Sequence, residues 1–287
     1  MKIFLSNKSY GFLRVSGKDS KSFLNGQLSC NIEKLKERNP INCYYINIKG
    51  RISSSFIIYM QSIDDYVIFI RKDIVLSFLQ DLTKYIMFLD VKVNDISEKL
   101  SSITIINSIL EDEELYKLKT VNFRSKEKTL LFMHNSDEEY IYKYIIKYPG
   151  CEKINCDEYK YFNIKHGLFD LNVSTINKFL PNYTNILHNI DFSKGCFRGQ
   201  EVIARIKNLS SVKKGLAILK KDNLEMSHIY NEKIYVDTPA NKSVGEVVEF
   251  AMFKGDTYIL VSIQLNLNNI YIYKIKSIRN IKLIRYI

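Results

Sequence analysis

The sequence contains no tryptophan, only 4 prolines in 287 residues, and no long apolar run. A helix that crosses a membrane needs about 18 or more consecutive apolar residues, so the sequence predicts no membrane-embedded segment. The first residues, Met1–Asn7, have neither the apolar core of a secretory signal nor the pattern of a transit peptide. We therefore expect a cytoplasmic protein without a membrane partner.

The chain also lacks an even, closely spaced set of cysteines. It has 5, at positions Cys30, Cys43, Cys151, Cys156 and Cys196. An odd, scattered number of cysteines in a chain without a secretory signal predicts no disulfides. Cys151 and Cys156 are close together, but no second close pair and no histidine cluster completes a zinc site. The sequence thus predicts no structural metal.

Basic residues are plentiful but not clustered. The formal net charge is +11, yet the lysines are scattered and form no basic run. Abundant Lys, Asn, Ile, Tyr and Phe with scarce proline are what an AT-rich coding sequence produces. A nucleic-acid interface needs a basic stripe or a known module, so we expect no direct contact with nucleic acid. A basic surface still attracts anionic small molecules and acidic partner proteins.

The first half of the chain alternates strands and helices. We expect a strand over 11–16, a helix from Asp19 or Ser20, and a hairpin of strands 42–49 and 52–60. Further expected elements are a strand at 66–71, a helix from Asp73, and strands near Val91, Ile103 and Leu130. This order is typical of βαββαβ-type modules, in which helices cover one face of an antiparallel sheet.

The second half changes in texture. Residues 137–147 and 157–166 read as helices, and 170–192 as a long loop, which in compact proteins is often functional. After a boundary near 208–213, short apolar runs with polar breaks predict a small β-barrel or sandwich: 215–219, 233–236, 244–250, 258–265 and 270–275.

The most informative stretch is Lys194-Gly195-Cys196-Phe197-Arg198-Gly199-Gln200-Glu201. Glycines allow a positive φ or a close approach to a ligand. Cationic side chains and the start of a helix near Val202 favour the thiolate form of the cysteine. The stretch therefore predicts a functional thiol, and the alternative is a tight turn around a buried, inert cysteine.

This stretch resembles the Lys-Gly-Cys-aromatic-x-Gly-Gln-Glu signature of the YgfZ-type folate-binding proteins, whose members include mitochondrial homologues that help assemble [4Fe-4S] proteins. Two other segments agree in the expected order. Phe23-Leu24-Asn25-Gly26-Gln27-Leu28-Ser29-Cys30 resembles the N-terminal Phe-Leu-x-Gly-Gln-Leu-Thr segment. Asn47-Ile48-Lys49-Gly50-Arg51 resembles the Asn-x-Lys-Gly-Lys/Arg turn. The match covers most of residues 10–210.

The family is similar to the glycine-cleavage T-protein, which implies an α+β fold of three domains in a cloverleaf around a folate-sized opening. The implied first module is discontinuous, with residues 1–45 and about 136–208. The second is 46–135, and 209–287 form a C-terminal β-barrel.

Two departures from the T-protein pattern bear on activity. Ser53-Ser54-Ser55 follow the Gly50 turn where T-proteins carry paired aspartates, and a serine supplies neither the charge nor the base of a carboxylate. Lys165 stands where a glutamate can hold the pterin ring, and an ammonium accepts no hydrogen bond. Both substitutions speak against aminomethyl transfer, and the second speaks against folate bound in the T-protein pose.

The resemblance implies an accessory factor for assembly or repair of [4Fe-4S] proteins, indirectly supporting tRNA modification, rather than an enzyme. Cys196 would act as a redox thiol or as a transient ligand of an iron-sulfur cluster shared with a carrier or client protein. The residues expected around tetrahydrofolate or another cofactor are Lys194, Gly195, Gln200, Glu201, Arg205 and Lys165. The alternative is a folate-dependent aminomethyl or one-carbon transferase, and a third possibility is a plain folate-binding module.

Overall fold

The computed structural model describes residues 1–5, 9–106, 120–125, 128–184, 186–209, 214–224, 229–236, 242–265 and 272–287. Contacts divide the chain into two compact units. The first comprises Met1–Tyr45, Ser54–Asn155 and Asp191–Arg198, and the second Ile46–Ser53, Cys156–Ile190 and Gly199–Ile287. The three-domain boundaries at 45, 136 and 208 stay a prediction, and the stretch 210–213 lies outside the described residues.

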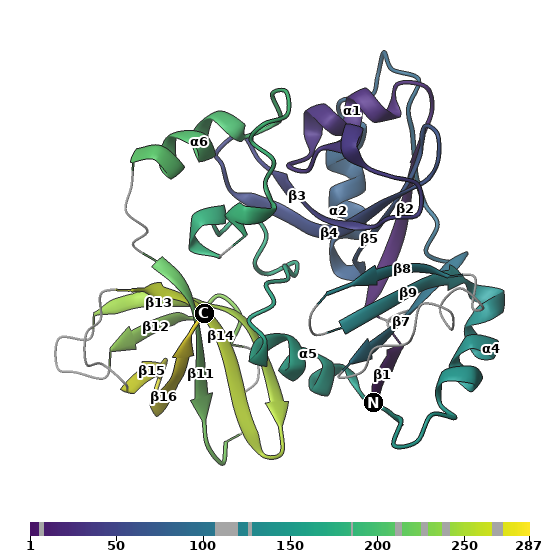
Figure 1. The fold of residues 1–287 in the computed structure, drawn as a ribbon. Coiled ribbons are helices and arrows are strands. Elements are labelled where there is room, and N and C mark those ends of the chain that lie inside the picture. The colour runs from purple at the N-terminus through teal and green to yellow at the C-terminus, as the bar shows by residue number, and fades with distance from the viewer. Residues whose placement is uncertain are drawn as a thin grey trace. The chain divides into compact units, whose positions relative to one another are not determined.

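The first unit contains two five-stranded sheets (Figure 1). One sheet has the order β3-β4-β5-β2-β6, and the other β10-β1-β7-β9-β8. The strands of the first sheet are β2 (Tyr10–Ser16), β3 (Ile41–Ile46), β4 (Ile52–Ser62), β5 (Asp65–Arg71) and β6 (Lys92–Asp95). Those of the second are β1 (Lys2–Leu5), β7 (Leu100–Ile106), β8 (Val121–Arg124), β9 (Lys128–His134) and β10 (Glu152–Lys153).

The two sheets pack face to face through an aromatic core. Phe12, Tyr59 and Phe69 of one sheet meet Phe132 of the other, with Tyr59 stacked on Phe132 at 5.7 Å between ring centroids. Helices cover the outer faces: α2 (Lys72–Thr83) lies on the first sheet and α4 (Asn135–Ile145) on the second. The shorter helix α1 (Ser20–Gln27) follows β2, and a 3-10 turn spans Ile32–Lys34. Burial of both sheet faces gives this unit four layers, α/β/β/α.

The second unit is built on a closed barrel, β11-β14-β13-β12-β15-β16. Its strands are β11 (Lys214–Lys221), β12 (Lys233–Val236), β13 (Ser243–Phe253), β14 (Asp256–Gln264), β15 (Ile272–Ile275) and β16 (Ile278–Tyr286). Helix α5 (Cys156–Lys165) packs on β13, where Tyr161 stacks on Phe253 at 4.1 Å. A long connection with 3-10 turns at Pro181–Tyr183 and Leu187–Asn189 follows, and α6 (Gln200–Leu209) completes the unit.

The expected α+β fold with a C-terminal β-barrel is confirmed. The strand over 11–16, the hairpin around Gly50 and the long loop 170–192 are also confirmed. The sequence analysis missed β1, β8, β10 and β16, and the predicted start of a strand at 270–271 lies outside the described residues. No helix in the described part of the chain is long and apolar enough to cross a membrane.

The expectation of no disulfide is wrong, because Cys30 and Cys43 are joined, with their Cα atoms 5.3 Å apart. The residues after α1 run antiparallel to β3: Leu28 is bridged to Tyr45, and Ser29 N–H donates to the Tyr44 carbonyl at 3.0 Å. This register places Cys30 directly opposite Cys43. The number of cysteines and the lack of a secretory signal say nothing about which cysteines lie opposite each other, so the sequence analysis missed this pair.

Alkylation under denaturing conditions tests this disulfide. Before reduction we expect 3 modified cysteines, Cys151, Cys156 and Cys196, since these are the free thiols. After reduction, all 5 cysteines of the chain should react. Mass spectrometry of the intact protein and of its peptides gives both counts. Five modified cysteines before reduction would contradict the pairing.

Candidate functional site

The side chain of Lys194 anchors the turn that carries Cys196, and we call residues Asp191–Arg198 the Cys196 turn. Lys194 is 8% exposed. Its ammonium donates to the carbonyls of Asn25, Leu28 and Cys30 at 2.5, 2.7 and 2.8 Å. Carbonyls at a helix C-terminus lack intrahelical partners and favour a cation. Lys194 therefore caps the end of α1 from a distant part of the chain.

Arg198 closes the other end of the turn. Its backbone N–H donates to the Gly26 carbonyl at 3.0 Å, another terminal carbonyl of α1. Its guanidinium donates to the Tyr45 hydroxyl and lies 4.9 and 5.0 Å from the ring centroids of Tyr45 and Tyr85. Burial raises the pKa of Tyr45 to about 12, although Arg198 acts against this shift. Arg198 Nε and Gln27 Oε1 are buried without a partner among the described residues.

Asp191 orders the entry to the turn. Its Oδ1 accepts from the backbone N–H and hydroxyl of Ser193 at 2.9 and 2.5 Å, and its Oδ2 pairs with Lys34 at 3.0 Å. These hydrogen bonds, first those from Ser193 and Lys34, hold the pKa of Asp191 well below its ordinary value. Asp191 N–H donates to the Ser29 carbonyl at 3.0 Å. The Asp-x-Ser pattern before Lys194 is the sequence signal for this turn, and the sequence analysis did not use it.

Cys196 is a free and exposed thiol. Lys194 and Phe197 are buried, whereas Gly195 and Cys196 between them are exposed, so the backbone is held on both sides of an exposed thiol. The alternative of a buried cysteine is therefore wrong, and a function for the thiol stays a prediction. The Lys194 ammonium binds carbonyls, and the Arg198 guanidinium contacts the tyrosines. Both cations therefore position the turn.

The remaining motif residues belong to the second unit, where the hairpin tip packs against α6. Gly199 has φ +79°, and a Cβ there would lie 2.5 Å from the Asn47 carbonyl. Gly50 has φ +74°, and its Cβ would lie 2.7 Å from a methyl of Val202. Only glycine fits these two positions without strain. Gly195 differs, because its Cβ would meet nothing within 4 Å.

The long loop is fastened to the same hairpin. Asn177 Oδ1 accepts from Asn47 Nδ2 at 2.8 Å and from the Ser53 hydroxyl at 2.6 Å, while Asn177 N–H donates to the Ile52 carbonyl at 2.8 Å. The Ser53 hydroxyl thus joins the loop to the start of β4. A hollow of about 370 Å³ beside it is lined by Asn47, Ile48, Lys49, Arg51 and Asn177.

The other expected binding residues lie on two helices of the second unit. Gln200 begins α6, and Glu201 and Arg205 are exposed one turn apart on it. Lys165 is the exposed last residue of α5, and its carbonyl accepts from Arg285. Contact of Lys194, Gly195, Gln200, Glu201, Arg205 or Lys165 with a ligand stays a prediction. The described residues include no group of three or more His, Cys, Asp or Glu side chains arranged to hold a metal ion.

Comparison with known proteins supports the resemblance. The chain is 26% identical over 300 residues to the tRNA-modifying protein YgfZ of Buchnera aphidicola from Acyrthosiphon pisum, covering 94% of this chain and 90% of that one. It is also 26% identical to the tRNA-modifying protein YgfZ of Aliivibrio fischeri, with 73% and 68% covered. An uncharacterized protein of Haemophilus influenzae is 27% identical, with 91% and 89% covered. No family model matches the chain.

Among solved structures, the aminomethyltransferase T of the Bartonella henselae glycine cleavage system matches with a TM-score of 0.73. The alignment covers 98% of this chain and 84% of that one at 9% sequence identity, so it shows the fold alone. These findings confirm the similarity to YgfZ-type proteins and the T-protein-like fold that the sequence motifs indicated.

Replacing Lys194 tests its structural role. Lys194→Met leaves three buried carbonyls unpaired, and we expect it to lower the free energy of unfolding by about 3 kcal/mol. The matched control is Lys34→Met, which breaks one exposed ion pair and should cost less than about 1 kcal/mol. Urea denaturation measures both. Equal losses in the two variants would contradict the anchoring role.

The stability difference between wild type and Lys194→Met should also depend on pH. Burial lowers the pKa of Lys194 to about 8 from 10.5. The cost of burying the charge is therefore fully present below about pH 8 and is relieved as the pH rises toward 10.5. The stability difference between wild type and Lys194→Met should grow over this interval, while that of Lys34→Met should not.

The two glycines of the motif should respond differently to alanine. Gly199→Ala places a Cβ against a backbone carbonyl and in a left-handed conformation, so we expect a loss of at least about 2 kcal/mol. Gly195→Ala adds a Cβ in open space and should leave stability unchanged or raise it by up to about 1 kcal/mol. Thermal and urea unfolding of both variants give the comparison. A tolerated Gly199→Ala would show that the hairpin tip does not hold α6 as described.

Proposed function

We propose that this protein is an accessory factor for the assembly or repair of iron-sulfur proteins, and that it acts through the thiol of Cys196. The observation that carries the proposal is a free, exposed cysteine on a turn whose backbone is fixed on both sides by Lys194 and Arg198. The relatives named tRNA-modifying proteins support an indirect link to tRNA modification, because radical enzymes that thiolate tRNA contain iron-sulfur clusters.

Thiolates are the usual ligands of iron-sulfur clusters. Cys196 would lose its proton to solvent and bind one iron of a cluster that is cargo rather than a resident cofactor. One thiolate does not fill the coordination of a cluster, so the remaining ligands must come from the cysteines of a carrier or client protein. Because the backbone of the Cys196 turn is already fixed, little conformational entropy is lost when the sulfur binds.

Aminomethyl transfer is the rival activity, and the T-protein-like fold is the observation in its favour. The Ser53 hydroxyl donates to Asn177, which gives this residue a structural role. Ser54 and Ser55 are buried and supply no carboxylate. A serine hydroxyl is not a base at neutral pH, so a one-carbon transfer would lack the group that T-proteins use.

Complementation of a bacterial strain that lacks its own YgfZ-type protein tests the proposal. The readouts are the thiolated nucleosides of its tRNA and the activity of an iron-sulfur enzyme in its extract. We expect Cys196→Ser to give values close to those of the empty vector. The matched control is Cys156→Ser, which changes another free, exposed cysteine and should complement fully.

Immunoblots must show equal amounts of the two variants. A Cys196→Ser protein that complements as well as wild type would overturn the proposal. Tetrahydrofolate then separates the alternatives. Turnover of a folate substrate would favour the one-carbon transferase, whereas calorimetric binding at micromolar affinity, near −8 kcal/mol, that does not need Cys196 would favour a plain folate-binding module.

A further inference from the structure

A cavity lies between the two sheets of the first unit, apart from the Cys196 turn. Its volume is about 290 Å³, which is near the lower end of ligand pockets, roughly 300–1,000 Å³. Gln61, one of its lining residues, lies near the end of β4, whereas Ser54 and Ser55 lie near the start of that strand. A strand rises about 3.3 Å per residue, so Gln61 lies roughly 23 Å along β4 from Ser54.

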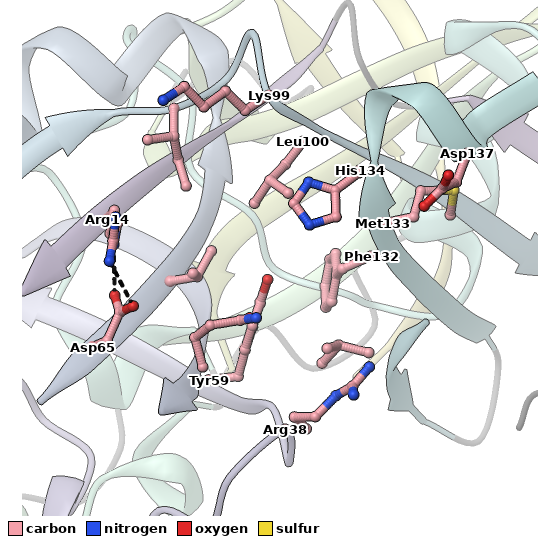
Figure 2. Close-up of a pocket in the computed structure, with 14 residues that line it drawn as sticks. Arg14, Arg38, Tyr59, Asp65, Lys99, Leu100, Phe132, Met133, His134 and Asp137 are labelled. Atoms are coloured by element: carbon pink, nitrogen blue, oxygen red, sulfur yellow. Dashed lines mark hydrogen bonds and ion pairs between the residues drawn. The ribbon is translucent and has the colours of Figure 1, made fainter. Parts of the chain in front are cut away.

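The floor of the cavity is apolar and aromatic. Tyr59 and Phe132 are each 2% exposed and stack with an interplanar angle of 15°. Figure 2 shows both rings and His134 facing the same space. The other apolar lining residues are Val67, Ile96, Leu100, Val121 and Met133. The two rings are almost fully covered by each other and by the core between the sheets, and the apolar lining as a whole favours the apolar body of a ligand over water.

The rim carries the charges, and their balance is positive. Arg14 and Asp65 neutralise each other through two hydrogen bonds of 2.8 and 2.9 Å. Arg38 and Lys99 then face a single carboxylate, Asp137, and Figure 2 shows Arg38 and Lys99 on opposite sides of the space. A cation beside a low-dielectric floor attracts an anionic group more strongly than the same cation in open water.

Arg38 is held at this rim by its backbone. Its φ is +55°, which is uncommon for a residue with a side chain, and its N–H donates to the Met60 carbonyl at 2.8 Å. Non-glycine residues in this region concentrate at ligand sites, where surrounding structure maintains the conformation. The charge of Arg38 also acts on the buried Tyr59 hydroxyl, whose pKa is raised mainly by burial and lowered in part by Arg38.

We propose that this cavity binds a small aromatic molecule of one or two rings that carries an anionic group. The ring system lies against the apolar lining, and the anion meets Arg38. The proposal is independent of the Cys196 thiol.

The absence of tryptophan provides a direct binding assay. Indole-3-acetate can be excited where the protein's tyrosines do not absorb, so its fluorescence anisotropy reports its own binding. We expect a saturable rise in anisotropy. The neutral amide, indole-3-acetamide, has the same shape and should bind roughly tenfold more weakly, because it lacks the charge-assisted contact with Arg38.

Two variants locate the anion. Arg38→Gln should lower the affinity for indole-3-acetate roughly tenfold and leave that for the amide unchanged. Lys36→Gln is the matched control: it removes an exposed cation two residues away that does not line the cavity, and it should change neither affinity. Equal affinities for the two probes, or equal effects of the two variants, would overturn the proposal.

Methionine methyl NMR shows where the probe sits. Met133 lines the cavity, whereas Met87 of the same unit is 80% exposed outside it. Saturating indole-3-acetate should shift the Met133 methyl signal and leave the Met87 signal in place. Absence of saturable binding, or an unshifted Met133 with saturable binding, would place no ligand here and would refute the proposal.

Discussion

The buried ammonium of Lys194 is the constraint on which the Cys196 turn depends. A charge removed from water is costly unless donors and acceptors around it are matched. Three carbonyls from the end of α1 and the residues after it provide this match at 2.5–2.8 Å. The same contact satisfies helix-end carbonyls that would otherwise need water. If the turn moved away from α1, the Lys194 ammonium and the carbonyls at the end of α1 would both lose their hydrogen-bond partners.

This constraint gives the family motifs a physical meaning. The 23–30 segment supplies backbone carbonyls, and Lys194 and Arg198 supply the donors that reach them. In the second unit, Gly50 and Gly199 are the residues that let the hairpin tip and α6 approach within contact distance. The motifs therefore record backbone contacts between segments that are far apart in sequence, and Cys196 is the exposed thiol among them.

Local pattern was enough to predict the hairpin around Gly50, the strand 11–16 and the barrel, because periodicity and turn residues are properties of neighbouring positions. It was not enough for Lys194, whose role is defined by carbonyls about 165 residues away, since carbonyl positions carry no side-chain signal. The Cys30–Cys43 disulfide was missed for a related reason: it follows from the register between the end of α1 and β3. The cavity lined by Tyr59 and Phe132 also needs the packing of two sheets, which no single segment encodes.

An exposed thiol on a fixed turn has a consequence for exchange chemistry. A resident metal site requires several ligands from one chain, and binding energy then opposes release. In the proposed function, Cys196 would contribute one ligand, so a cluster bound there would depend on cysteines of the partner and would leave with them. The rigidity that Lys194 and Arg198 impose lowers the entropy lost on contact, and the missing further ligands keep the contact transient. Fixed geometry with a single ligand suits transfer better than storage.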